Sequence, residues 1–431
     1  MCGIRMKRIT VLTLIFILLV LPIISIDTIE PAIITNIESK GNLSYTPNPN
    51  IYVDEFADFA TEGFLGSGTV GAPFYIDDLI FNSTGNLIEI RDTDAYVEIR
   101  NCYFTKNAAA PSTIGIYLYN ASHVTVKNCI FFNISSVADV NWFSTDFTLV
   151  DCVSNGTSGA YVDAWVSPNV NITGNTLDGV YDGGQITIDF CNDSFIFDNT
   201  LNSAHIGVEH SNGTIVREND IDHDFISVYE SKGVFVQDNN LIGNLGYPAI
   251  QMHTCTNCTV ENNEASDYLD SDGTYYVTQS VEIVLVNNSA QLDGFATNAD
   301  FGFNVEHSSQ CHLENNTADG FLHSGFRFYN VSDTDVHNNT AVDNDYWGFS
   351  ADESYRLEFT NCTAHNNPKR GFGIYDSNET YIGHCVSIEN GNDGYYIINC
   401  LDTSMFYCNA ILNEYCGFVL SGGSNNLLWD C

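Results

Sequence analysis

Apolar and polar residues alternate in a short unit that repeats along most of this chain. The unit is clearest near the C-terminus, where six segments of the form glycine, aromatic residue, alternating residues begin 23 residues apart, at Gly302, Gly325, Gly348, Gly371, Gly394 and Gly417. Alternation with a period of two predicts strands, and a repeat this short, with turn residues between the strands, is typical of a β-solenoid. We therefore expect each repeat to form one rung of a solenoid.

A column of Asn and Cys residues extends this register over most of the chain. Its members recur every 20 to 28 residues, at Cys102, Cys129, Cys152, Asn175, Asn199, Asn219, Asn239, Asn263, Asn288, Asn316, Asn339, Cys362, Cys385, Cys408 and Cys431. Three residues before each member stands an apolar residue, and in the later rungs a second apolar position, thirteen before, holds Phe303, Phe326, Phe349, Phe372, Tyr395 and Phe418. These positions predict inward stacks, with the Asn amides bonded to one another inside the core. The column indicates roughly fifteen rungs.

The chain divides into three predicted regions. Residues 1–26 read as a signal peptide or N-terminal anchor, because three basic residues precede an apolar run from Ile9 to Leu21 that is short for a membrane span. Residues 27–63 are predicted as a linker and an N-terminal cap, with a short helix from Val53 to Thr61. Residues 64–431 form the solenoid, and its end on the Cys431 rung leaves an open edge that predicts a truncated C-terminus.

Several segments of the repeat carry a resemblance to a known family. The entry motif GFLGSGTVGAPFYIDDL and the later NNTADGF, NNTAVDND and NCTAHNN resemble the pectate-lyase-like superfamily, and especially NosD-type repeats of secreted proteins, over residues 64–431. The resemblance implies an all-β, single-stranded right-handed parallel β-helix. It says little about function, since that superfamily includes lyases, hydrolases and adhesins.

The net charge of the chain limits the kinds of molecule that it can bind. There are 54 acidic residues against 14 basic ones, for a formal net charge of −40. Such a surface repels phosphate backbones, which argues against nucleic acid as a partner, and attracts cations such as calcium. Sequons for N-glycosylation recur at Asn82, Asn120, Asn133, Asn155, Asn171, Asn212, Asn330 and Asn378. We expect an extracellular or cell-surface glycoprotein that meets a membrane only through its N-terminal segment, where that segment is uncleaved.

The 14 cysteines have two alternative explanations. Seven occupy the inward column, where Cys replaces Asn as a small buried residue, which predicts a ladder of free thiols. Disulfides between adjacent rungs remain the alternative for an exported protein. His253, Cys255 and Cys258 could hold a soft metal ion, and the NosD-type resemblance implies copper. However, Cys258 falls on an inward position and His253 on an outward one, so we do not expect the three to converge.

The position ten residues before the Asn and Cys column faces outward and carries the candidate site. It reads Tyr119, Trp165, Asp189, Glu209, Tyr229, His253, Thr278, Glu306, Tyr329, Asp352 and Tyr375. Aromatic rings stack on sugar faces and carboxylates accept hydroxyl hydrogen bonds, so this column predicts a glycan-binding face. Short turns after Asn199 and Asn219, between longer ones, predict a notch beside Asp189, Glu209 and Tyr229. The predicted ligand-binding residues are Trp165, Asp189, Glu209, Tyr229 and His253, with Tyr329 and Asp352 farther along.

Catalysis is the alternative for the same face. Asp189 and Glu209 on adjacent rungs could stand near the roughly 5 Å of a retaining glycosidase pair. A lyase would instead use Asp163, Asp189 and Glu209 for calcium, although the glycan-binding function requires no cofactor. No Arg or Lys occupies this face near the notch to accept a proton, and Arg327 is several rungs away. The NTD, DD, GHG and RIK series of polygalacturonases is missing as well. Three classes stay open: a binder of extracellular glycans, a polysaccharide lyase or glycoside hydrolase, and a structural spacer or adhesin that contacts cell-surface proteins.

Overall fold

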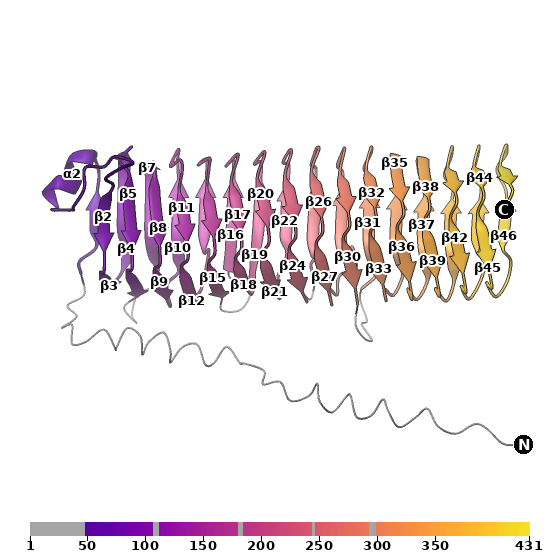
Figure 1. Cartoon of the computed structure of the whole chain (residues 1–431), viewed down its shortest axis with the longest axis horizontal. Coiled ribbons are helices and arrows are strands. Elements are labelled where there is room, and N and C mark those ends of the chain that lie inside the picture. Colours follow the sequence, from indigo (N-terminus) through magenta and orange to yellow (C-terminus); the bar gives the residue numbers. More distant parts are fainter. Residues whose placement is uncertain (1–47, 107–111, 180–183, 244–245, 293–298) are drawn as a thin grey trace, which may run out of the picture. The chain divides into compact units, whose positions relative to one another are not determined.

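The computed structural model describes residues 48–106, 112–179, 184–243, 246–292 and 299–431. The predicted signal peptide or anchor at 1–26, and the predicted linker up to residue 47, lie outside the described residues. From Pro47 to Cys431 the chain is one compact unit. In this unit, short strands lie side by side along a single axis (Figure 1).

The strands form three parallel sheets, and each strand pairs with the strand three places later in the chain. Sheet B contains β1 Ile51–Val53, β4 Gly85–Thr93, β7 Thr113–Ala121, β10 Ser136–Asn141, β13 Val162–Trp165, β16 Gly184–Asp189, β19 Ala204–Glu209, β22 Ile226–Tyr229, β25 Ile250–His253, β28 Tyr275–Thr278, β31 Phe301–Glu306, β34 Ser324–Tyr329, β37 Trp347–Asp352, β40 Arg370–Tyr375, β43 Tyr395–Ile398 and β46 Phe418–Ser421.

Sheet C contains β2 Phe74–Asp77, β5 Val97–Arg100, β8 Val124–Lys127, β11 Thr148–Val150, β14 Asn171–Thr173, β17 Phe195–Phe197, β20 Ile215–Arg217, β23 Phe235–Gln237, β26 Thr259–Glu261, β29 Val284–Val286, β32 His312–Glu314, β35 Ser332–His337, β38 Tyr355–Thr360, β41 Tyr381–Gly383, β44 Ser404–Phe406 and β47 Leu427–Trp429. Sheet A contains β3 Ile80–Ser83, β6 Tyr103–Lys106, β9 Ile130–Phe132, β12 Val153–Thr157, β15 Thr176–Gly179, β18 Thr200–Asn202, β21 Asp220–Asp222, β24 Asn240–Ile242, β27 Glu264–Ser266, β30 Ser289–Gln291, β33 Thr317–Asp319, β36 Thr340–Val342, β39 Thr363–His365, β42 Val386–Ile388 and β45 Asn409–Ile411. Three strands make one turn, so the predicted right-handed parallel β-helix of about fifteen turns is confirmed.

The aromatic stack predicted for the later rungs lies in the core. The rings of Phe326 and Phe349 stack with centroids 4.8 Å apart, as do those of Phe349 and Phe372, and all three side chains are fully buried. The spacing equals the separation of neighbouring strands, so each ring sits directly over the ring of the previous rung. Phe418 is only half-buried, because no following rung covers it.

The Asn and Cys column forms a continuous polar ladder inside this apolar core. The side-chain Nδ2 of Asn219 donates to Oδ1 of Asn239 at 2.9 Å, and the backbone N–H of Asn219 donates to the same oxygen at 3.0 Å. Where Cys replaces Asn, the backbone N–H of Cys129 points at Sγ of Cys152 at 3.4 Å. All 13 cysteines of the described residues have free thiols, and all are buried except Cys416 and Cys431, as the thiol ladder predicts.

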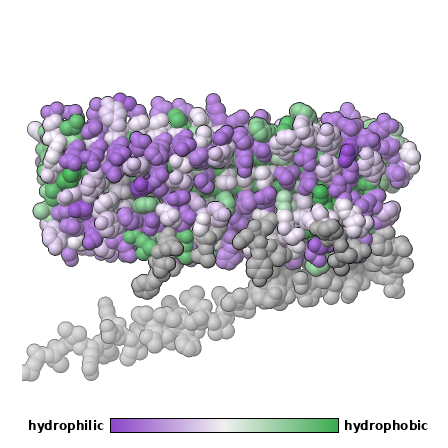
Figure 2. Space-filling model, turned by 180° about the vertical axis from the view of Figure 1, so that it is seen from behind, coloured by the Kyte–Doolittle hydropathy of each residue, from purple (hydrophilic) through white to green (hydrophobic). Residues whose placement is uncertain are grey.

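The N-terminal end carries α2 (Phe56–Thr61), within the span where a capping helix is predicted. Phe59 of this helix is buried and stacks on Phe74 of β2, with ring centroids 4.6 Å apart. Its role as a cap stays a prediction. The solenoid face shown in Figure 2 is hydrophilic over most of its area, with small separate apolar spots. Within the described ranges, no helix has the length and apolar character needed to cross a membrane.

Candidate functional site

The predicted outward column lies at the C-terminal ends of the sheet B strands. Its members are register partners on successive strands, so Trp165 of β13 lies beside Asp189 of β16, Glu209 of β19 beside Tyr229 of β22, and Asp189 beside Glu209. His253 of β25 continues the row. We call this row the outer column: Tyr119, Asn141, Trp165, Asp189, Glu209, Tyr229, His253, Thr278, Glu306, Tyr329, Asp352 and Tyr375.

The outer column is interrupted at one position. The side chains from Trp165 to His253 are half-buried or exposed, as expected for an outward row. Thr278 is the register partner of His253 and Glu306 in this row, but it is covered, with only 5% of its surface exposed, so it offers no contact to a ligand. This covered position divides the column into a first stretch that ends at His253 and a second stretch that begins at Glu306.

A second row, which the sequence did not reveal, stands beside the outer column. The residue that follows each strand end takes the left-handed conformation, and at four of the five successive strand ends from β10 to β22 it is a large side chain: Trp142, Phe190, His210 and Glu230, with φ between 45° and 53°. We call these four residues the turn column. These residues lie at the bend between each sheet B strand and the sheet C strand that follows it. The sequence does contain one sign of this row: each of its residues directly follows a residue of the outer column.

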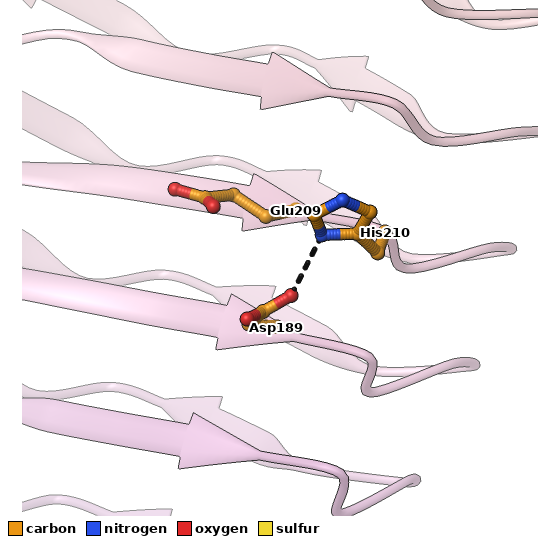
Figure 3. A group of neighbouring side chains, drawn as sticks. All are labelled: Asp189, Glu209 and His210. Atoms are coloured by element: carbon orange, nitrogen blue, oxygen red, sulfur yellow. Dashed lines mark hydrogen bonds and ion pairs between the residues drawn. The ribbon is translucent and has the colours of Figure 1, made fainter.

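The two columns bring Asp189, Glu209 and His210 together (Figure 3). Asp189 and Glu209 end neighbouring strands, and Nδ1 of His210 lies 2.9 Å from Oδ1 of Asp189. One side-chain donor atom from each of the three residues lies within 4.8 Å of the others. Nε2 of His210 is 3.2 Å from a carboxylate oxygen of Glu230. The hydrogen bond to Asp189 and the charge of both carboxylates raise the pKa of His210 above its ordinary value.

Aromatic rings flank this cluster on both sides. The ring of Phe190 stacks on the imidazole of His210 at 4.4 Å, and Tyr229 stacks on His253 at 4.6 Å. Trp142 meets Trp165 edge to face at 4.5 Å. Phe190, Tyr229 and Trp142 each expose between 39% and 49% of their surface, which leaves ring faces available to a ligand.

The predicted calcium residue Asp163 is not a member of the three-residue cluster. It lies two residues before Trp165 on β13, opposite Asp139 of β10. Burial raises the pKa of Asp163, and the negative charge of the neighbouring Asp189 carboxylate raises it further. The cluster instead holds an imidazole and two carboxylates, a donor set that suits a transition-metal ion better than calcium, which prefers oxygen ligands alone.

The triplet of His253, Cys255 and Cys258 does not converge, as expected. Sγ of Cys255 points inward at the backbone oxygen of Val228, 3.3 Å away, and Cys258 is fully buried. His253 stacks outward on Tyr229.

A pocket of about 250 Å³ lies at the second predicted location, in the second stretch of the outer column. Its lining includes Arg327 of β34, Trp347, Ser350 and Asp352 of β37, Tyr375 of β40, and Asp376. The rings of Trp347 and Tyr375 stack at 5.4 Å. They meet above Gly373, where an added Cβ would lie 3.2 Å from Tyr375 and 3.7 Å from Trp347.

Burial and neighbouring charges shift the pKa values of the ionisable groups in this pocket. Burial raises the pKa of Asp352, and the carboxylates of Glu353 and Asp376 raise it further. Burial raises the pKa of Tyr375 to about 12. Arg327 is bonded to Glu306 and, at 3.1 Å, to Oδ1 of Asn304.

Comparison with known proteins gives two family matches. Residues 224–387 and 348–431 match the model described as right handed beta helix region. Residues 143–294, which contain the cluster of Asp189, Glu209 and His210, match the model described as periplasmic copper-binding protein (NosD). No curated protein matches the sequence.

Solved structures with the same kind of fold share little sequence with this chain. The periplasmic alginate epimerase AlgG, as a point mutant, is 12% identical, with 84% of each chain covered and a TM-score of 0.43. PfbA, a surface adhesin of Streptococcus pneumoniae, is 9% identical, covering 77% of this chain and 91% of its own, at 0.39. An alginate lyase from Paenibacillus is 13% identical, covering 60% of this chain and 99% of its own, at 0.38. The three parallel sheets and the family matches together identify the chain as a right-handed parallel β-helix protein.

Proposed function

We propose that this protein is exported and binds an extracellular polysaccharide along the outer face of sheet B. The observation that carries the proposal is the first stretch of the outer column, in which Trp165, Asp189, Glu209, Tyr229 and His253 stand on five successive strands. Strands repeat every ~4.8 Å, so the face offers a regular row of stacking and hydrogen-bonding groups to a polymer that is itself a repeat.

The turn column supports the same function. Phe190 and Trp142 add exposed ring faces along the edge of the row, and the imidazole of His210 adds a donor between Asp189 and Glu230. Rings held by stacking on a neighbour lose little freedom when a sugar binds, which favours affinity. The match to a family described as periplasmic agrees with export.

Substitution of Tyr229 tests the binding face. Tyr229→Ala should weaken binding of a glycan, first found on a glycan array, by about 1 to 3 kcal/mol in calorimetry while the fold persists. Phe235→Ala is the matched control, because Phe235 is 40% exposed against 39% for Tyr229 but stands on sheet C. Equal losses in both variants, or no glycan bound by the native protein, would contradict the proposal.

A second pair of variants separates a binder from an enzyme. Asp189→Asn and Glu209→Gln remove the two carboxylates that a glycosidase or lyase would use. For a binder, we expect no release of reducing ends or unsaturated products by the native protein, and partial affinity in both variants. Turnover by the native protein that falls by orders of magnitude in the variants would place the protein among the polysaccharide-degrading enzymes.

We also propose that the cluster of Asp189, Glu209 and His210 binds a divalent transition-metal ion. The three donor atoms within 4.8 Å of one another lie inside the region that matches the copper-binding family model. Imidazole nitrogen with carboxylate oxygens is a donor set that Cu²⁺ accepts. Titration with Cu²⁺, followed by electron paramagnetic resonance, should show one nitrogen-containing site that His210→Ala abolishes and His312→Ala keeps. A spectrum unchanged by His210→Ala would refute this site.

A further inference from the structure

The side chains that line the pocket between β34, β37 and β40 differ from those of the first stretch of the outer column. We infer that this pocket binds a sugar ring that carries a free ammonium group, so that the polysaccharide recognised by the protein is an amino sugar polymer. The inference rests on the proposed function and names the chemical class of its ligand. Its elements are the carboxylates of Asp352 and Asp376 and the stacked rings of Trp347 and Tyr375.

The negative charge of the pocket is not compensated. In the part of the chain that the structure describes, the side chains of Asp352 and Asp376 form no ion pair, although both line the pocket. The nearby carboxylate of Glu353 has only the hydroxyl of Tyr329 as a partner, at 3.3 Å. The residues Asp352 and Asp376, on neighbouring turns, therefore line this pocket without an ion-pair partner for either carboxylate.

The positive charges beside the pocket already have partners. Arg327 is bonded to the carboxylate of Glu306 and lies over the ring of Tyr329, 5.1 Å from its centroid. Nε of Arg370 lies 3.4 Å from a carboxylate oxygen of Asp393. A carboxylated sugar would therefore meet two guanidinium groups that are already paired, and the carboxylates of Asp352 and Asp376. An ammonium group meets the opposite balance, since neither carboxylate has an ion-pair partner among the described residues, and the one cation that acts on Asp352 electrostatically, Arg327, is already paired with Glu306.

The aromatic lining suits the same ligand. Trp347 and Tyr375 present ring faces, which attract cations and pack against the apolar face of a sugar. A volume of about 250 Å³ limits the ligand at this point to one ring.

The whole chain favours a cationic polymer over an anionic one. The net charge is −40, so a polymer of uronic acids approaches against long-range repulsion, whereas a polymer of free amino sugars is attracted.

Binding of three soluble oligosaccharides to the full chain tests the inference. Oligomers of glucosamine, of N-acetylglucosamine and of a uronic acid have similar rings and differ in charge. We expect the glucosamine oligomer to bind at least tenfold more tightly than the other two in calorimetry at physiological salt. The double substitution Asp352→Asn and Asp376→Asn should reduce the affinity for the glucosamine oligomer about tenfold. It should leave the affinity for the N-acetylglucosamine oligomer unchanged.

A matched double variant controls for net charge. Asp335→Asn with Glu358→Gln removes two exposed carboxylates that are register partners on sheet C, in the same turns as the pocket but on another face. This variant should keep the affinity for the glucosamine oligomer. An equal loss in both double variants would mean that general attraction, and not the pocket, selects the ligand, and would overturn the inference.

The other outcomes separate this inference from the proposed function. Binding of the N-acetylated or uronic acid oligomer as tightly as the glucosamine oligomer would overturn the inference and leave polysaccharide binding intact. Free glucosamine and methylamine distinguish a sugar from a bare amine, and equal binding of the two would also overturn it. If no oligosaccharide binds at all, the proposed function fails, and the inference fails with it.

Discussion

Replacing Asn239 with alanine measures what the Asn ladder contributes to stability. Oδ1 of Asn239 accepts the backbone N–H of Asn219 at 3.0 Å and its Nδ2 at 2.9 Å. Nδ2 of Asn239 donates to Oδ1 of Asn263 at 2.9 Å and to the backbone oxygen of Val216 at 3.0 Å. Alanine removes all four hydrogen bonds and leaves the N–H of Asn219 buried beside a methyl group.

The expected cost follows from these four contacts. A buried donor left without a partner costs about 1 to 3 kcal/mol, and each of the other three bonds contributes about 0.5 to 1.5 kcal/mol. Some of that loss is recovered, because Nδ2 of Asn219 keeps its bonds to the backbone oxygens of Ile196 and Arg217. We therefore expect the free energy of unfolding to fall by about 3 to 5 kcal/mol.

The chain itself offers the control. Cysteine occupies the same column at Cys152, where its Sγ lies 3.4 Å from the backbone N–H of Cys129. Asn239→Cys should therefore restore an acceptor for the N–H of Asn219 and cost about half as much as alanine. Urea unfolding followed by circular dichroism measures the difference, and hydrogen exchange at the amide of Asn219 locates it. Equal losses for alanine and cysteine, or a loss below about 1 kcal/mol for alanine, would refute the role assigned to the ladder.

Three further predictions concern the core, the thiols and the acid limb of stability. Phe349→Ala should lower the free energy of unfolding by about 3 to 5 kcal/mol in urea titrations, because it leaves a cavity between two stacked rings. Burial raises the pKa of the Cys385 thiol, so alkylation followed by mass spectrometry should modify it only after unfolding; a disulfide found at this residue would contradict the thiol ladder. The hydrogen bond from Arg100 lowers the pKa of Asp77 from 3.8, so this pair stabilises the fold above that value and the contribution is lost as the pH falls through the folded-state pKa. Arg100→Gln should make the melting temperature less dependent on pH below about 4, and an unchanged acid limb would show that the pair does not matter.

The fold could be predicted from the sequence because each turn of the solenoid restricts the residue types at the same inward positions. A residue such as Asn239 must be inward, small and able to bond to its neighbours above and below, and only a few residue types meet these conditions at one position in each turn. The Phe326 and Phe349 positions are equally restricted by stacking. The same constraint recurs on turn after turn, so the period stands out against an otherwise variable sequence.

The candidate site was only partly predictable for a physical reason. Period-two alternation correctly assigned Asp189 and Glu209 to the outer face, but it does not extend past the end of a strand. His210 belongs to the left-handed turn that follows, and its approach to Asp189 depends on that turn. The contact of Trp347 with Tyr375 likewise depends on side chains that lie flat over Gly373, which no spacing along the chain reveals.

The uniform 23-residue turns near the C-terminus also make the length of this protein adjustable. Phe326, Phe349 and Phe372 are interchangeable units of one column, so inserting or deleting a whole turn at Gly348 would join strands that already match in register. An insertion of another size keeps the later outward side chains in their row only where a loop between strands absorbs it, as happens in the turns of 20 to 28 residues elsewhere in the chain. Duplication of a single turn would thus lengthen the outer column by ~4.8 Å and repeat its side chains. The added turn would pack on the existing core in the same way as its neighbours.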